Sequence, residues 1–115
     1  MKKLISSFVI ALLVTSFINA QDSKVVESEF KVFGNCGMCK ARIEKAMKIK
    51  EVKIARWDKN SKILKVAFLS PDITVDSLMH RIAIVGHDTE KYKADSAVYS
   101  KLPACCLYRD GNNTH

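Results

Sequence analysis

Four cysteines in two close pairs are the side chains of this chain best suited to chemistry. Cys36 and Cys39 stand three positions apart in the order Cys-Gly-Met-Cys, and Cys105 and Cys106 are adjacent near the C-terminus. Thiolates are preferred ligands of soft, thiophilic ions. Two thiolates without further protein ligands suit Cu(I), whereas Zn(II) takes four donors. The first pair therefore predicts a site for one soft ion, with Cu(I) favoured and Hg(II), Zn(II) or Cd(II) as alternatives.

The same pair has two other uses in an oxidising compartment, a structural disulfide and a reversible redox dithiol. The intervening residues are Gly and Met, with no Trp before the pair and no Pro within it. The motif follows the first expected strand of a chain that is short for a thioredoxin core. Metal binding is the favoured interpretation because the motif and the expected fold agree.

The elements around Cys36 and Cys39 explain how the two thiols could meet. Residues 28–33 alternate in polarity and predict a strand, and the turn-prone residues 34–37 end it. A helical period then runs from residue 38 or 39 to residue 48. The pair thus stands where a loop enters a helix, and there the peptide N–H groups and the helix dipole stabilise thiolate over thiol.

Further elements complete an alternating order of strands and helices. A second helix should begin at the N-cap Thr74 and end at Gly86. Further strands are expected at residues 52–58, 62–69 and 89–94. A helical turn could cover residues 97–102. The order predicts an α+β, ferredoxin-like βαββαβ sandwich, an antiparallel sheet with two helices on one face, plus a short C-terminal extension.

The segment Phe-Gly-Asn-Cys-Gly-Met-Cys at 33–39, followed by a helix in this strand order, resembles the heavy-metal-associated domain family. That family includes copper chaperones, N-terminal domains of copper-exporting ATPases and the periplasmic mercury-binding protein. The resemblance covers residues 29 to about 94 and implies that Cys36 and Cys39 are the two metal ligands. One departure is Gly34, since the family usually has Met at that place, packed beneath the loop. The loop is therefore expected to be less firmly anchored.

Three further residues are candidates for additional ligands. In the family's fold the loop after the second helix lies beside the metal loop, and His87 belongs to that loop. Its imidazole could be a third ligand of the ion or a hydrogen-bond donor to a thiolate. The alternative is an ordinary exposed loop residue. For Cys105 and Cys106 the hypothesis is that the tail folds back and supplies extra thiolates. They could instead recruit a second ion, hand a metal to the first pair, exchange disulfides with it, or bridge to another chain.

The N-terminus predicts export. A positive start, an apolar run over residues 4–18 and Ala20 before a polar stretch have the layout of a signal peptide cleaved after Ala20. The run is shorter than the roughly 20 residues of a membrane span, the alternative interpretation. The expected organisation is a signal peptide (1–20), a linker (21–27), a heavy-metal-associated domain (28–95) and an extension carrying the Cys-Cys pair (96–115). The location would be periplasmic in a Gram-negative bacterium.

Charge and motifs narrow the function class. The chain of 115 residues has a formal charge of +7, and loss of Lys2 and Lys3 with the leader lowers it to about +5. Basic and acidic residues are interspersed, which argues against nucleic-acid binding. No pattern of nucleophile, base and orienting acid indicates an enzyme. We expect a binding protein, a monomer or a metal-bridged dimer, with no membrane span after signal removal. It would exchange its ion with a metal transporter or efflux component, and a thiol–disulfide redox protein is the alternative.

Overall fold

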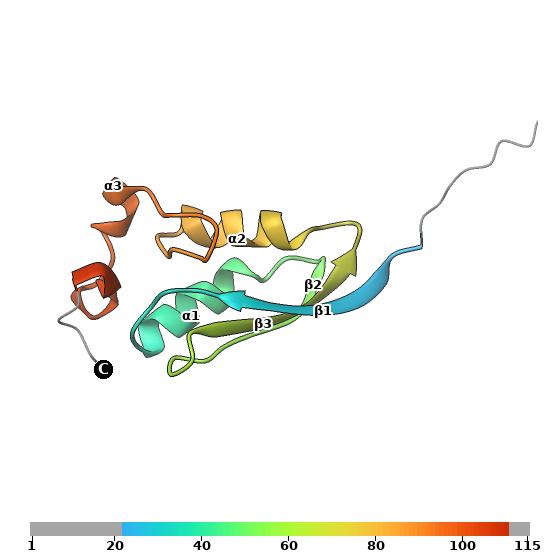
Figure 1. Ribbon diagram of the computed structural model, residues 1–115, viewed down its shortest axis with the longest axis horizontal. Helices are drawn as coiled ribbons and strands as arrows, with labels where there is room; N and C mark the ends of the chain where they lie inside the picture. The colour runs from blue at the N-terminus through green and yellow to red at the C-terminus, as the bar shows by residue number, and fades with distance from the viewer. Residues whose placement is uncertain (1–21, 111–115) are drawn as a thin grey trace, which may run out of the picture.

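The computed structural model describes residues 22–110, so the expected signal peptide lies outside the described residues. Three strands form one antiparallel sheet in the order β1-β3-β2, and two longer helices pack against it (Figure 1). The elements are β1 (Lys24–Lys31), α1 (Gly37–Ala46), β2 (Val52–Trp57), β3 (Ile63–Ser70), α2 (Val75–Ile84), α3 (Ser96–Tyr99) and two 3₁₀ turns, η1 (Ala104–Cys106) and η2 (Tyr108–Asp110). The predicted α+β, ferredoxin-like fold is confirmed.

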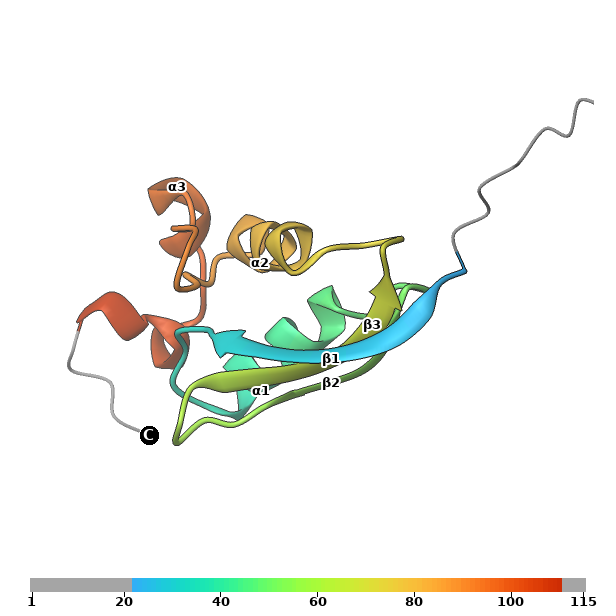
Figure 2. The ribbon, with the colours of Figure 1, turned by 45° about the vertical axis from the view of Figure 1, so that its right-hand side comes forward.

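The central strand β3 shows why both helices lie on one face of the sheet. Its Leu64, Val66 and Phe68 alternate with more exposed positions, and all three are at most 4% exposed. Their side chains join Ile43 of α1 and Ile82 of α2 in a single hydrophobic core. Figure 2 shows the sheet with α1 and α2 behind and above it. Apolar residues recur every two positions in the strand and about every 3.6 positions in the helices, so each element has one apolar face, and these faces meet in the core.

Helix α2 begins and ends where the sequence predicts. The Thr74 hydroxyl accepts a hydrogen bond from the backbone N–H of Ser77, and the Ser77 hydroxyl accepts one from the backbone N–H of Thr74, which forms a capping box. Gly86 follows the helix with a φ of 108°, a left-handed conformation that favours glycine. Both ends of α2 are therefore set by local side-chain and backbone chemistry.

Helix α1 begins at the cysteine pair. Cys36 is its N-cap residue, with an extended backbone and no side-chain cap, and the helix ends at Ala46, two residues earlier than predicted. Cys39 and Ile43 are its buried residues. The segment between the bridge at Val32 and α1, residues 33–36, is called the cysteine loop below. This loop and the start of α1 lie at one end of the sheet, beside the C-terminal tail (Figure 1).

The predicted fourth strand, residues 89–94, is not formed within the described chain. A single bridge, Val32 to Thr89, stands in its place. The reason is a local turn: the Thr89 hydroxyl accepts hydrogen bonds from the N–H groups of Lys91 and Tyr92, and the Thr89 N–H donates to the Tyr92 carbonyl. These bonds curl the chain where a strand would have to run extended. The first strand also differs, since it covers Lys24–Lys31 and not residues 28–33.

The C-terminal tail (residues 96–110) turns back toward the cysteine loop. It comprises α3, η1 and η2, and Figure 1 shows the 3₁₀ turns, in red, beside the start of α1. The helical turn predicted at 97–102 corresponds to the shorter α3. Among residues 22–110, no helix has the length and apolar character needed to cross a bilayer.

Candidate metal centre

The structure brings all four cysteines together. The sulfur of Cys36 lies 3.6 Å from that of Cys39, 3.6 Å from that of Cys106 and 3.0 Å from that of Cys105. The two tail sulfurs are 3.9 Å apart. None of the four is in a disulfide. The sulfurs of Cys36, Cys39 and Cys106 all lie within 4.8 Å of one another, so three buried donors could contact one ion.

Helix α1 and the cysteine loop place the first pair. The backbone N–H of Asn35 donates to the sulfur of Cys39 over 3.3 Å, and the side chain of Cys39 is fully buried. Cys36 is 9% exposed. Both sulfurs therefore lie at the positive end of the helix dipole, among N–H donors that favour a thiolate.

The thiols differ in acidity. Burial opposes ionisation of Cys36, but hydrogen bonds from Cys105, from the Cys39 backbone and from Cys106 outweigh it and lower the pKa of Cys36 to about 7. Burial raises the pKa of Cys106, and the hydrogen bond to Cys36 raises the pKa of Cys105. Cys36 is thus more acidic than either tail thiol and ionises near neutral pH. An ion bound by the tail thiols would have to displace their protons.

The tail is held in place by four side chains, Asp88, Tyr99, Tyr108 and Arg109, here called the tail clamp. The Arg109 guanidinium donates to both carboxylate oxygens of Asp88, over 3.0 and 2.6 Å, and its cation lies 4.3 Å from the Tyr99 ring centroid. The Tyr108 hydroxyl donates to the Gly86 carbonyl and accepts from the Asp88 N–H, both at 2.8 Å. Burial would raise the pKa of Asp88, but Arg109 holds it below its usual value.

His87 is fully buried, so the interpretation as an exposed loop histidine is wrong. Its Nδ1 lies 2.8 Å from the Phe33 carbonyl, which can only accept, so Nδ1 carries the proton. Burial lowers the pKa of His87 to about 4, and the imidazole is neutral near pH 7. The structure places Arg42 beside it: Arg42 Nη1 is 3.4 Å from His87 Nε2 and 3.3 Å from the Cys106 sulfur. His87 supports the cysteine loop and lies outside the three-sulfur group.

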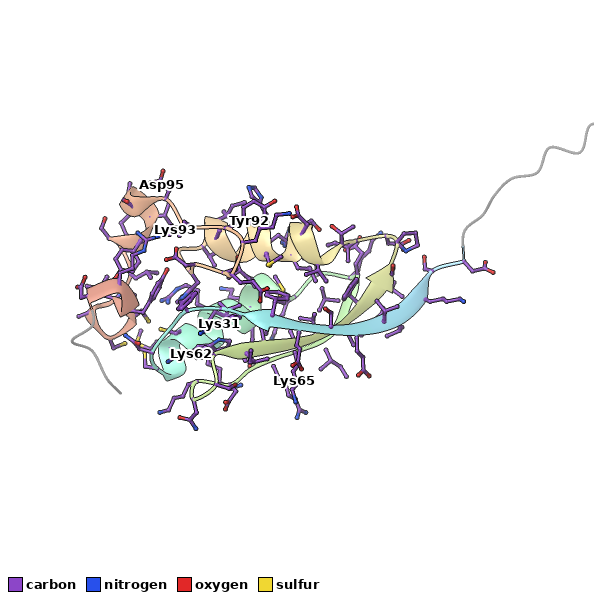
Figure 3. All side chains as sticks on the ribbon, in the orientation of Figure 1. Lys31, Lys62, Lys65, Tyr92, Lys93 and Asp95 are labelled. Carbon is purple, nitrogen blue, oxygen red and sulfur yellow. The ribbon has the colours of Figure 1, made fainter. Side chains whose placement is uncertain are left out.

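Trp57 fills the space beneath the cysteine loop, where the family usually packs a methionine. A Cβ on Gly34 would lie 3.2 Å from two carbons of the Trp57 ring, so the indole closely approaches this position. The ring nitrogen donates to the Val32 carbonyl over 2.9 Å. Lys62, labelled in Figure 3, donates to the Gly34 carbonyl over 2.6 Å. The loop therefore has a different anchor, one that leaves little room for a side chain at position 34.

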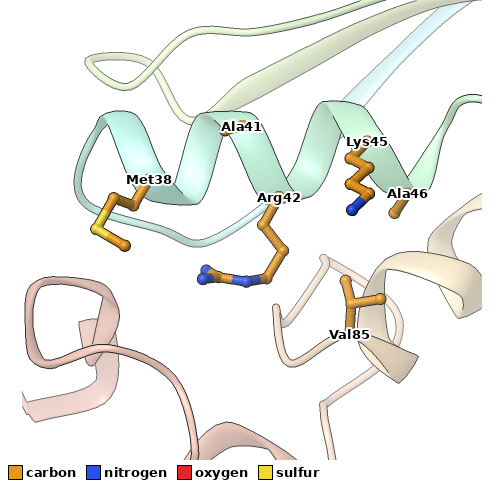
Figure 4. A pocket seen from close by; sticks show the side chains of 6 residues that line it. All are labelled: Met38, Ala41, Arg42, Lys45, Ala46 and Val85. Atoms are coloured by element: carbon orange, nitrogen blue, oxygen red, sulfur yellow. The ribbon is translucent and has the colours of Figure 1, made fainter.

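Arg42 is a residue beside the thiols that the sequence pattern did not identify. Figure 4 shows its guanidinium in an open groove along α1, whose other lining residues are Met38, Ala41, Lys45, Ala46 and Val85. Arg42 stands three positions after Cys39, on a neighbouring part of the helix surface. The spacing of three residues between Cys39 and Arg42 was the sequence feature that could have predicted a cation close to the thiols.

Comparisons with known proteins agree with the fold. No family model matches the chain, and no curated protein matches it. Among solved structures, the CopZ metallochaperone is 24% identical with a TM-score of 0.53, over 56% of this chain and 98% of that one. The N-terminal domain of a potential copper-translocating P-type ATPase from Bacillus subtilis, in its Cu(I)-loaded state, is 25% identical with a TM-score of 0.53, over 57% and 85%.

A third solved structure, oxidized MerP from Ralstonia metallidurans CH34, is 20% identical with a TM-score of 0.54, over 58% of this chain and 96% of that one. These proteins are matched over most of their own length by little more than half of this chain. The fold is therefore of the heavy-metal-associated type, and the resemblance predicted from the cysteine motif is confirmed at the level of the fold.

Proposed function

We propose that this chain is a binding protein that captures one soft metal ion through Cys36 and Cys39 and passes it on by thiolate exchange. The observation that carries the proposal is the convergence of free sulfurs at the start of α1. The pKa of Cys36, lowered to about 7, supports it. A thiolate available near neutral pH is what a thiophilic ion needs as its first ligand.

The similar solved structures support a soft metal ion as the bound species. They include a metallochaperone and an ATPase domain in its Cu(I)-loaded state. The two-cysteine motif by itself favours Cu(I), with Hg(II), Zn(II) and Cd(II) as alternatives.

Transfer requires that a partner's thiolate reach the ion. Cys105 is partly exposed, and its sulfur lies 3.6 Å from that of Met38, which is 52% exposed. This corner of the cluster gives an incoming ligand a path to the buried sulfurs. We propose a metal transporter or efflux component as the partner, and an exported, periplasmic setting for the monomer.

Single substitutions test the proposal. Cys36→Ser and Cys39→Ser should each abolish retention of Cu(I) by the reduced chain in native mass spectrometry. Met79→Leu is the matched control, because it removes a buried sulfur of α2 at nearly constant volume. Full occupancy in either cysteine variant would contradict the proposal.

One observation favours a second candidate, a thiol–disulfide redox protein. The sulfurs of Cys36 and Cys105 are only 3.0 Å apart, and the more acidic thiol of the two is Cys36, as for an attacking and a resolving cysteine. Insulin reduction and a measured reduction potential test this candidate. Activity that survives in Cys39→Ser while metal binding is lost would favour it.

A further inference from the structure

We propose that Cys106 is a third thiolate ligand and Arg42 its counter-charge, so that the site is built for a divalent thiophilic ion such as Hg(II) or Cd(II). This inference rests on the proposed function and names the class of ion that it takes. It departs from the two-sulfur motif, which alone favours Cu(I). Three features carry it: the spacing of the sulfurs, the charge around Cys106, and the contrast with Cys105.

The spacing fits three ligands better than two. For a Zn–S bond of about 2.3 Å, two opposed sulfurs lie about 4.6 Å apart and three in a trigonal arrangement about 4.0 Å apart, and the larger Hg(II) and Cd(II) widen both spacings. The sulfur of Cys36 is 3.6 Å from both Cys39 and Cys106, and all three sulfurs lie within 4.8 Å of one another. The first pair is thus too close for a linear two-sulfur site, and its spacing and that of the third sulfur are nearer to a trigonal arrangement, which a small outward movement of the sulfurs would complete.

The charge around Cys106 selects the ion. Cys106 is fully buried, and Arg42 Nη1 lies 3.3 Å from its sulfur. Three thiolates and a divalent ion carry a net charge of −1, which the guanidinium neutralises, whereas a monovalent ion on the same three thiolates would leave −1 uncompensated. Buried charge is costly unless it is paired.

Several other charged groups near the site have partners of their own. Asp88 pairs with Arg109, and Lys40 pairs with Glu44. Lys62 donates to the backbone carbonyl of Gly34. Among residues 22–110, Arg42 is the cation that donates a hydrogen bond to a sulfur of the cluster. Its guanidinium also lies beside the ring of His87.

Cys105 differs from Cys106 although the two are adjacent. Its sulfur is 3.0 Å from that of Cys36, about 1 Å too close for both to bind one ion without moving. It is partly exposed and contacts Met38. Cys105 therefore lies outside the proposed three-sulfur site, and its substitution is a matched control for that of Cys106 in equilibrium binding.

X-ray absorption on the reduced protein loaded with Hg(II) or Cd(II) counts the sulfur ligands, and competition titrations give the affinities. We expect three sulfurs in the wild type and in Cys105→Ala, and two in Cys106→Ala. Cys106→Ala should lose about 10- to 100-fold in affinity for Cd(II), and less than about 3-fold for Cu(I). Arg42→Gln should keep three sulfurs and lose about 10-fold for Cd(II).

Two sulfurs in the wild type, or an equal loss of Cd(II) affinity in Cys105→Ala and Cys106→Ala, would overturn the inference and leave the proposed function standing. Failure of the wild type to bind Hg(II), Cd(II) or Cu(I) would overturn both. Circular dichroism identifies any variant that does not fold. If Cys106→Ala is such a variant, an unchanged preference for Cd(II) over Cu(I) in Arg42→Gln overturns the inference.

Discussion

Gly34 stands where a single added methyl group would meet two rigid neighbours. A Cβ there would lie 3.0 Å from the Cβ of Cys39 and 3.2 Å from two Trp57 ring carbons. Nonbonded carbons favour about 3.5–4.0 Å, so Gly34→Ala forces shifts of roughly half an ångström. Cys39 belongs to the first turn of α1, and the Trp57 ring is tied to the Val32 carbonyl. Overpacking of this kind costs about 1–3 kcal/mol.

Thermal unfolding of the reduced protein measures this cost. A loss of about 2 kcal/mol in a domain of this size lowers Tm by roughly 10 °C. The control is Gly37→Ala, since a Cβ on Gly37 has no neighbour within 4 Å and Gly37 begins α1. That variant should unfold at an unchanged or slightly higher temperature. Equal Tm values for the two variants would refute the assignment of Trp57 as the support of the cysteine loop.

Two further predictions concern the tail and the loop after α2. Arg109→Met removes the bonds to Asp88 and Ala94, and loss of charge-assisted bonds worth about 1.5–3 kcal/mol should raise the alkylation rate of buried Cys106 about 10- to 100-fold. Mass spectrometry of the reduced chain measures that rate, and an unchanged rate would show that the clamp does not hold the tail. For His87, the folded pKa of about 4 lies below the ordinary 6.5, so the unfolded chain takes up a proton first. Stability is then complete above about pH 6.5 and falls by up to about 1.4 kcal/mol per pH unit toward pH 4. Chemical unfolding at several pH values measures this slope, which His87→Asn should reduce; the same slope in that variant would assign it to other groups.

The local features of the site were predictable from the sequence. Cys36 and Cys39 follow a strand-like segment and open a helical one, so their place at the start of α1 follows from neighbouring residues. The caps Thr74 and Gly86 are equally local signals. The absence of a strand at residues 89–94 was not predicted, because the sequence there alternates as in a strand. In the structure, hydrogen bonds to the Thr89 hydroxyl bend the chain instead.

That the tail folds back was a hypothesis from its cysteines, but the long-range contacts that hold it there could not be predicted from the sequence. The tail reaches the cysteine loop because Arg109 binds Asp88, 21 residues earlier, and no local pattern indicates that pair. The support of the loop by Trp57 depends on the pairing of β2 with β3. Gly34 gave the only indication of this support in the sequence, because a glycine at this position of the loop leaves space beneath it that another side chain must fill.

Whether the converging thiols hold a soft ion is tested most directly by elemental analysis of the reduced protein after anaerobic loading and gel filtration against a small competing thiol. We expect about one thiophilic ion per chain, lost when the cysteines are alkylated before loading. A protein that emerges without metal, or that keeps its metal after alkylation, would contradict the assignment of these sulfurs as the metal ligands.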